Sequence, residues 1–218
     1  MKESNLKWKI AQKLEYKWWQ KYLRSKNVDE YLAYKSDYWN TVLKTLSPFL
    51  TVQGQQQIMD AGCGPAGIFM VLEDNHVTAV DPLLHKYAEL PHFNASNYPW
   101  VNFLNQPLET LEQKETFDII FCMNAINHVN DIERCYDRLV AALKPGGVMV
   151  ISVDCHRSNI LKKIFQLLPG DMLHPVQLNL TEYNQKLTKR GMQVLHEVLY
   201  KRELIFDYFI TVAIKNHP

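Results

Sequence analysis

The sequence predicts an α/β protein whose mostly parallel sheet is covered by helices on both faces. Three observations support this prediction. Short apolar strands alternate with helical patterns after residue 55, a glycine pattern follows the first strand, and the last two strands are joined without room for a helix. Strands joined in that way must be antiparallel, because a parallel connection needs a crossover of a dozen or more residues. The 218 residues suit one such domain with some additional helix.

Two helices are predicted before the sheet. Residues 29–46 form one of them, with Asp29 as a plausible N-cap. Residues 6–23 form the other, and its apolar residues recur every four positions: Leu6, Ile10, Leu14, Trp18 and Tyr22. We therefore divide the chain into a helical cap, residues 1–50, and a sheet domain, residues 51–218.

Strands and helices then alternate along the sheet domain. The predicted strands are residues 56–61, 77–81, 100–104, 117–123, 148–154, 193–200 and 206–214. The predicted helices are residues 66–73, residues 131–143, residues 158–168 and a last one that Thr181 caps and Gly191 ends. The stretch Lys144–Gly147 is predicted to be the turn that ends one helix and starts the next strand.

The composition is that of a globular protein, and we expect it in the cytoplasm. Hydrophobic residues make up 47% of the chain and charged residues 22%. No apolar run approaches the roughly 20 residues of a membrane span, and the basic N-terminus lacks the apolar segment of a signal peptide. The four cysteines show no C-x-x-C spacing, which predicts reduced, mostly buried thiols and no metal site.

The stretch DAGCGPAG, residues 60–67, indicates a cofactor loop. Its glycines form a G-x-G-x-x-G pattern at Gly62, Gly64 and Gly67. Asp60 precedes this pattern, and a carboxylate there would repel a pyrophosphate and favour a ligand with an ammonium or sulfonium charge. S-adenosylmethionine carries both charges and has no phosphate. Asp81, at the end of the second strand, can bind both ribose hydroxyls, but acids do the same in dinucleotide-binding folds.

Polar residues stand at the carboxyl ends of five predicted strands. They are Asp60, Asp81, Asn105, Asn124 and Asp154. In an open parallel sheet, ligands bind beyond the carboxyl ends of the strands, at the point where the strand order reverses. The sequence therefore predicts a ligand site at this edge of the sheet.

Five ordered blocks resemble the class I S-adenosylmethionine-dependent methyltransferases over about residues 50–215. The blocks are IMDAGCGPAG, VTAVDP, FDIIFCMNAINHVND, LKPGGVMVISVD and LTEYNQKLTKRGMQVL. The nearest similarity is to the small-molecule subgroup that includes ubiquinone and menaquinone biosynthesis enzymes. The resemblance implies a Rossmann-like sheet of seven strands with an antiparallel last strand. It also implies transfer of a methyl group to oxygen, nitrogen or carbon of a small molecule.

The resemblance also implies a set of cofactor-binding residues. They are Asp60, Gly62, Cys63, Gly64, Asp81, Pro82, Leu108, Glu109 and Met123. Asp81 would hold the ribose, and Pro82 would lie beside the adenine. Many relatives have an acid where this chain has Pro107, so the usual acceptor for the adenine amine is missing.

Two residues after the fourth strand are the candidates for the acceptor side, Asn124 and His128. Many small-molecule relatives have a histidine at the place of His128, which lies just before a helix. As a general base it could take the proton of the acceptor; alternatively, it caps or packs the loop. His156 and His174 are weaker candidates for the same pocket.

The first helix carries an unusual charge. Residues 1–26 hold eight basic and two acidic residues, so this segment carries +6 and the rest of the chain −5 of the total +1. Packing on the domain would explain an amphipathic helix without any partner. The functional interpretations are a lid over an apolar or aromatic acceptor, or weak contact of residues 6–23 with an anionic membrane surface. An RNA methyltransferase, which the acidic body disfavours, and a non-catalytic cofactor-binding protein are the alternatives.

Overall fold

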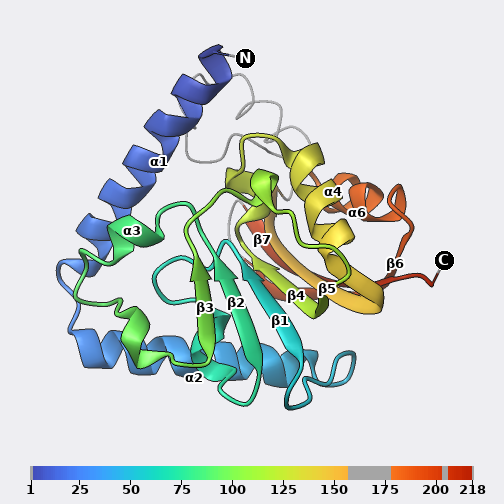
Figure 1. The fold of residues 1–218 in the computed structure, drawn as a ribbon, viewed down its shortest axis with the longest axis horizontal. Coiled ribbons are helices and arrows are strands. Elements are labelled where there is room, and N and C mark those ends of the chain that lie inside the picture. The colour runs from blue at the N-terminus through green and yellow to red at the C-terminus, as the bar shows by residue number, and fades with distance from the viewer. Residues whose placement is uncertain (1, 157–177, 203–205, 218) are drawn as a thin grey trace.

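A seven-stranded sheet with the order β3-β2-β1-β4-β5-β7-β6 forms the centre of the molecule (Figure 1). The computed structural model describes residues 2–156, 178–202 and 206–217. Its strands are β1 (Gln57–Ala61), β2 (His76–Val80), β3 (Val101–Leu104), β4 (Phe117–Met123), β5 (Leu143–His156), β6 (Met192–Arg202) and β7 (Phe206–Lys215). The first five strands pair in parallel, and β7 pairs antiparallel with both β5 and β6. The predicted mixed sheet is confirmed.

The described helices are α1 (Lys2–Leu23), α2 (Val28–Leu46), α3 (Leu84–Tyr87), α4 (Ile132–Ala142) and α6 (Leu180–Thr188). Of these, α2 packs on one face of the sheet, and α4 and α6 pack on the other. Neighbouring residues of β4 point to opposite faces, so Phe121 packs in the core beneath α2, whereas Ile120 packs in the core beneath α4 and α6. The predicted helix at residues 158–168 lies outside the described residues.

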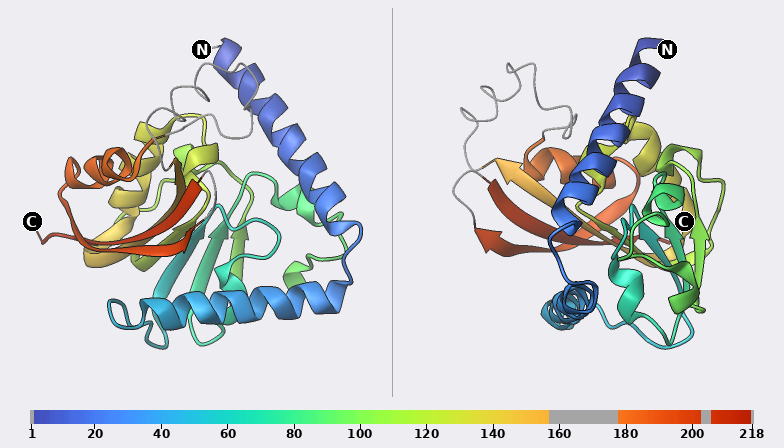
Figure 2. Two further views of the ribbon diagram at one scale, coloured as in Figure 1. Left: turned by 180° about the vertical axis from the view of Figure 1, so that it is seen from behind. Right: turned by 90° about the vertical axis from the view of Figure 1, so that its left-hand side faces the viewer.

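The two N-terminal helices form an angled pair beside the sheet. α2 runs across it, and α1 rises from one end of α2 toward the side where β1, β2 and β3 end (Figures 1 and 2). Val42 and Leu46 of α2 are fully buried against the sheet, and Leu23 at the end of α1 joins the same core. α2 is therefore part of the main hydrophobic core.

The helix predicted at residues 66–73 does not form. The structure has only a 3-10 turn there, η1 (Ile68–Val71). α2 packs beside this turn, and the indole Nε1 of Trp39 donates a 2.9 Å hydrogen bond to the carbonyl oxygen of Ala66. An N-terminal helix thus covers the face of the sheet on which a crossover helix between β1 and β2 would lie.

Two predicted caps are also corrected. The N-cap of α2 is Asn27, whose side chain accepts the backbone N–H of Glu30, while Asp29 stands in the first turn of the helix. The N-cap of α6 is Asn179, which forms a reciprocal capping box with Glu182. In both cases, an asparagine upstream of the predicted residue accepts the unpaired N–H groups of the first turn.

The stretch Lys144–Gly147 belongs to β5, where we predicted a turn before the strand. The pairing of β4 with β5 jumps from Leu143 to Val148, so these residues form an irregularity in the ladder. Gly146 has φ +75°, a backbone conformation that side chains disfavour, which explains a glycine at this place.

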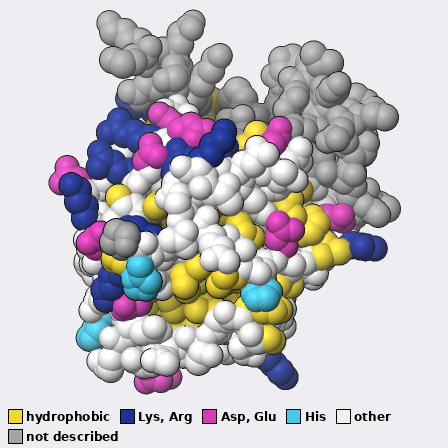
Figure 3. All heavy atoms as spheres, turned by 90° about the vertical axis from the view of Figure 1, so that its right-hand side faces the viewer, with side chains coloured by type: hydrophobic (Ala, Val, Ile, Leu, Met, Phe, Trp, Pro, Cys, Tyr) yellow, Lys and Arg dark blue, Asp and Glu magenta, His cyan; other side chains and the backbone are white. Residues whose placement is uncertain are grey.

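Seen from the side of β6, hydrophobic side chains form a band across the lower half of the surface (Figure 3). Leu195 and Leu199 of this edge strand are exposed. All four cysteines are buried and free, as predicted.

Among the described residues, no helix is long and apolar enough to cross a membrane.

Candidate functional site

A cavity of about 520 Å³ opens at the carboxyl ends of β1, β2 and β4. The loops after these strands and after β3 line one side of it, and helices α1 and α2 line the other. A volume of this size is typical of a small-molecule site. We call this cavity the cleft; it lies where the strand order reverses between β1 and β4, as predicted for the ligand site.

The glycine loop is shaped by close contacts that exclude larger residues. Gly62 has φ +75°, and a β-carbon there would lie 2.3 Å from that of Ala125. A β-carbon on Gly67 would lie 2.3 Å from the Oδ2 atom of Asp60. The first glycine therefore lets the loop turn beside the β4 loop, and the last leaves room for a carboxylate.

Asp60 lies behind this loop and does not line the cleft. Its Oδ2 atom accepts the backbone N–H of Phe69 at 3.1 Å, and the residue is only 1% exposed. Burial raises the pKa of Asp60 to about 7. Its direct role in this structure is to hold the chain that leaves the glycine loop, whereas the sequence placed it beside the ligand.

Asp81 lines the cleft and also holds the glycine loop. Its two carboxylate oxygens accept the backbone N–H groups of Gly64, at 3.0 Å, and of Leu83, at 2.8 Å. Burial raises the pKa of Asp81 to about 6, although both hydrogen bonds favour its ionised form. The arrangement places one carboxylate between the ends of β1 and β2.

The other predicted cofactor residues come together in the cleft. They are Gly62, Cys63, Gly64, Pro82, Leu108, Glu109 and Met123. The carboxylate of Glu109 binds the loop before α4, because its Oε1 atom accepts the backbone N–H groups of Asn130 and Asp131. Its side chain thus lines the cleft and fixes the loop that carries His128.

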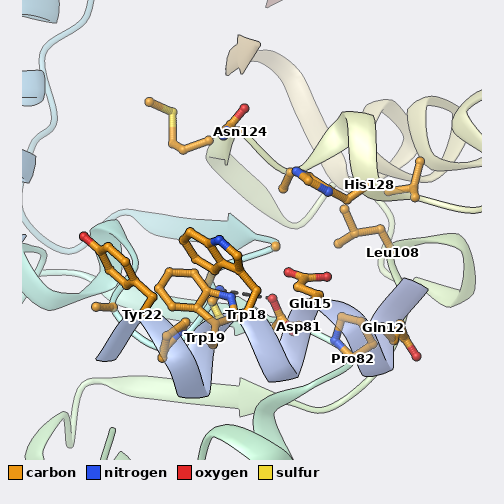
Figure 4. Close-up of a pocket in the computed structure, with 18 of the residues that line it drawn as sticks. Gln12, Glu15, Trp18, Trp19, Tyr22, Asp81, Pro82, Leu108, Asn124 and His128 are labelled. Carbon is orange, nitrogen blue, oxygen red and sulfur yellow. Dashed lines mark hydrogen bonds between the residues drawn. The ribbon is translucent and has the colours of Figure 1, made fainter. Parts of the chain in front are cut away.

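Asn124 and His128 lie across the cleft from α1 (Figure 4). Asn124 has φ +52°, and its backbone N–H donates to the carbonyl oxygen and to the Oγ atom of Ser152. That Oγ atom lies 2.5 Å from the hydroxyl of Tyr208, another residue of the cleft. His128 ends the short turn η4 (Ile126–His128), and its side chain lines the cleft.

The structure does not describe the two weaker histidine candidates in a comparable way. His174 lies outside the described residues, and His156 ends β5 without a described side chain. Their proposed place in the pocket stays a prediction.

The predicted apolar stripe of α1 is wrong in part as the inward face. Ile10 and Leu14 are 40% and 38% exposed and do not line the cleft, whereas Trp18 and Tyr22 do line it. A strict spacing of four residues advances about 40° per step around an α-helix, so it spirals away from any one face. The residues that line the cleft alternate spacings of four and three, and they include Trp8, Gln12, Glu15, Trp19 and Tyr22.

Glu15 is the main site residue that the sequence analysis missed. It points into the cleft beside Asp81 (Figure 4). Burial and the neighbouring Asp81 carboxylate raise the pKa of Glu15 to about 8. The amide Nε2 of Gln12, one turn earlier, is buried without a hydrogen-bond partner. The alternation of four and three, which also includes these polar residues, was the signal available in the sequence.

Comparisons with known proteins match this fold and this loop. Residues 58–147 match a family model described as a methyltransferase domain. The ubiquinone biosynthesis O-methyltransferase of Rickettsia prowazekii is 33% identical over 98 residues, which are 44% of this chain and 39% of that enzyme. The chain thus matches about two fifths of the length of such curated relatives.

Two solved structures share the fold at low sequence identity. The YcgJ protein of Bacillus subtilis has a TM-score of 0.64 at 14% identity, covering 83% of this chain and 98% of that protein. The 1,6-didemethyltoxoflavin-N1-methyltransferase of Burkholderia thailandensis, solved with 1,6-didemethyltoxoflavin and S-adenosylhomocysteine, has a TM-score of 0.60 at 19% identity. It covers 84% of this chain and 79% of that enzyme. These findings confirm the predicted fold, and residues 58–147 match a methyltransferase domain.

Proposed function

We propose that this chain is a class I S-adenosylmethionine-dependent methyltransferase and that it methylates a small-molecule acceptor. The observation that carries this proposal is the charge of the cleft beside the glycine loop. Asp81, Glu15 and Glu109 line it together. Carboxyl groups that line one cavity favour a ligand with an ammonium and a sulfonium charge, because such a ligand stabilises their ionised forms.

The form of the glycine loop supports the same cofactor over a dinucleotide. A pyrophosphate binds well where a helix N-terminus presents its unpaired N–H groups and positive dipole end. Here the loop leads into a 3-10 turn of four residues, Ile68–Val71, and one N–H of that turn is already bound to Asp60. The loop therefore offers little to a phosphate, and the nearby carboxylates would repel it.

The proposed reaction is a direct displacement. A lone pair of the acceptor attacks the methyl carbon as the bond from carbon to sulfur breaks, and its electrons stay on sulfur to give S-adenosylhomocysteine. His128 would accept the proton that a hydroxyl acceptor loses. Alignment of the two reactants in a dry cleft can lower the barrier by on the order of 7–11 kcal/mol.

The aromatic wall of the cleft supports an apolar or aromatic acceptor. Tyr38 and Trp39 of α2 and Tyr208 of β7 line the cleft, and Tyr208 is tied to the Asn124 loop through Ser152. Aromatic side chains exclude water and stack on flat ligands. The acceptor would lie between this wall and His128.

We also propose that the outer face of α1 makes weak contact with an anionic membrane surface. Its exposed Ile10 and Leu14 run beside a stripe of exposed lysines, which are Lys9, Lys13, Lys17 and Lys21. Apolar side chains flanked by lysines are typical of a helix that lies in the headgroup region of a bilayer. Cosedimentation with vesicles of anionic lipid measures this contact.

The cofactor proposal predicts that S-adenosylhomocysteine binds to the protein and that NAD does not. The carboxylates of the cleft attract the ammonium group of the first ligand and repel the pyrophosphate of the second. Titration calorimetry with both ligands under the same conditions measures the difference. Tighter binding of NAD would contradict the proposal.

Asp81→Asn should lower the affinity for S-adenosylhomocysteine at least tenfold. The change removes charge-assisted hydrogen bonds to the ribose, each of which contributes roughly 1.5–3 kcal/mol. It also leaves only one amide oxygen for the N–H groups of Gly64 and Leu83. Asp131→Asn is the matched control, because Asp131 accepts the backbone N–H of Arg134 at 3.0 Å as a helix cap outside the cleft. Unchanged affinity in the first variant would exclude Asp81 as the ribose ligand.

A further inference from the structure

The side chain of Lys35 places an ammonium group at the aromatic wall of the cleft. It lies on α2, and its Nζ atom lies 4.8 Å from the ring centroid of Tyr38 and 4.5 Å from that of Trp39. The indole of Trp39 is itself fixed by its hydrogen bond to the carbonyl oxygen of Ala66 in the glycine loop. The ammonium group is therefore held by rigid rings beside that loop.

No described acidic side chain contacts this ammonium group. Within the described part of the chain, Lys35 forms no ion pair, and Asp60 attracts it only from a distance. Burial lowers the pKa of Lys35 to about 8, which shows that the charged form has lost water without full compensation. Aromatic faces recover part of this loss, because a cation over such a ring gains about 0.5–2 kcal/mol.

The other charged side chains that line the cleft are acidic. Lys35 is the one lysine or arginine among the described residues that line the cavity, whereas Glu15, Asp81 and Glu109 supply carboxylates. A cavity that is lined by acids and by a single desolvated ammonium group fits a ligand that carries both a cation and an anion. The anion would complete the contacts of Lys35.

We propose that Lys35 forms a carboxylate-binding site in the cleft. This inference rests on the proposed function, because two sources of a carboxylate can meet in a methyltransferase cleft: the amino-acid end of the cofactor and an acidic acceptor. Both would form a charge-assisted hydrogen bond with the ammonium group, which is worth about twice a neutral one. The chemistry is the same, and ligand pairs that differ in the carboxylate separate the two sources.

The first arm compares S-adenosylhomocysteine with 5′-methylthioadenosine, which lacks the amino-acid end. Lys35→Met removes the charge and keeps most of the apolar stem. If the cofactor supplies the carboxylate, this variant should bind S-adenosylhomocysteine at least tenfold more weakly and 5′-methylthioadenosine as before. Lys35→Arg should retain most of the preference for S-adenosylhomocysteine. Lys44→Met, on the exposed last turn of the same helix, is the matched control.

The second arm tests an acidic acceptor in the protein saturated with S-adenosylhomocysteine. If the acceptor supplies the carboxylate, benzoate should bind at least tenfold more tightly than benzamide to the unaltered protein, and equally to Lys35→Met. The inference is overturned if Lys35→Met, with an unchanged unfolding temperature, alters neither preference. If neither S-adenosylhomocysteine nor 5′-methylthioadenosine binds to the unaltered protein, the proposed function fails first, and the inference fails with it.

Discussion

His128→Gln should lower turnover by about 10²–10⁴-fold and leave the affinity for S-adenosylhomocysteine unchanged. His128 lines the cleft at the end of η4, on the side that faces α1 (Figure 4). Histidine is the side chain that most readily takes up a proton near neutral pH, whereas glutamine has similar size and no basic nitrogen. A variant that binds the cofactor normally and turns over slowly therefore identifies a group that acts on the acceptor.

The measurement needs an acceptor, which mass spectrometry of small molecules that copurify with the protein would supply. Turnover is then the rate at which S-adenosylhomocysteine forms. His76→Gln is the matched control, because His76 is exposed at the start of β2, at the opposite end of the strand from the cleft. Near-normal turnover of the His128 variant would assign this side chain to packing of the loop before α4.

The sheet could be predicted because each strand is a short apolar run between residues that favour turns. Phe117–Met123 is such a run, and it forms the central strand β4. The antiparallel pairing of the last strands follows from their short connection alone. These inferences depend on local sequence and on connection lengths, and both can be read from the sequence.

The roles of the acidic residues could be predicted less well. Asp60 and Asp81 both end or follow a strand, yet Asp81 lines the cleft and Asp60 turns behind the loop. Successive side chains of a strand point to opposite faces, and the sequence does not state which face the ligand occupies. The space that Gly67 leaves beside Asp60 was visible only in three dimensions.

The contribution of the N-terminal helices could not be predicted, because it depends on tertiary packing. Nothing in the local pattern of residues 66–73 shows that α2 will cover the face where a helix was predicted. The orientation of α1 likewise depends on contacts far along the chain, such as the packing of Trp19 against the ring of Tyr87. Lys35 and Glu15 became site residues only through these contacts.

Removal of residues 1–17 should leave a folded protein that binds S-adenosylhomocysteine at least tenfold more weakly and has lost turnover. The deletion takes Gln12 and Glu15 out of the cleft, while Trp19 and the buried Leu23 remain to close the core. If Glu15 forms one charge-assisted hydrogen bond with the ligand, its loss costs roughly 1.5–3 kcal/mol, which corresponds to a tenfold or larger change in affinity. Water admitted to the cleft would also weaken the electrostatic interactions within it.

A variant on the outer face of α1, made in the chain without the deletion, provides the control. Ile10→Ser with Leu14→Ser changes only exposed side chains of α1. If α1 acts as a lid, this double variant keeps cofactor binding and turnover, whatever its effect on binding to anionic vesicles. The lid is contradicted if the deletion retains full activity and loses vesicle binding, because α1 would then serve only as a surface anchor. If the deletion does not fold, as a thermal unfolding scan would show, α1 belongs to the core.

Glu15→Gln adds a pH dependence that separates a charge in the cleft from simple coverage of it. Burial and Asp81 raise the pKa of Glu15 to about 8, so in the unliganded protein this carboxyl loses its proton only as the pH rises toward that value. The unfolded chain loses the same proton near its ordinary pKa of 4.5. The free energy of unfolding should therefore fall as the pH rises from about 4.5 to 8. The ammonium group of S-adenosylhomocysteine favours the ionised form of Glu15, and binding of this ligand should therefore strengthen as the pH rises from about 6 to 8. Glu15→Gln should reduce the pH dependence of the free energy of unfolding and that of ligand binding. An unchanged pH dependence of binding would mean that this carboxylate does not face the ligand.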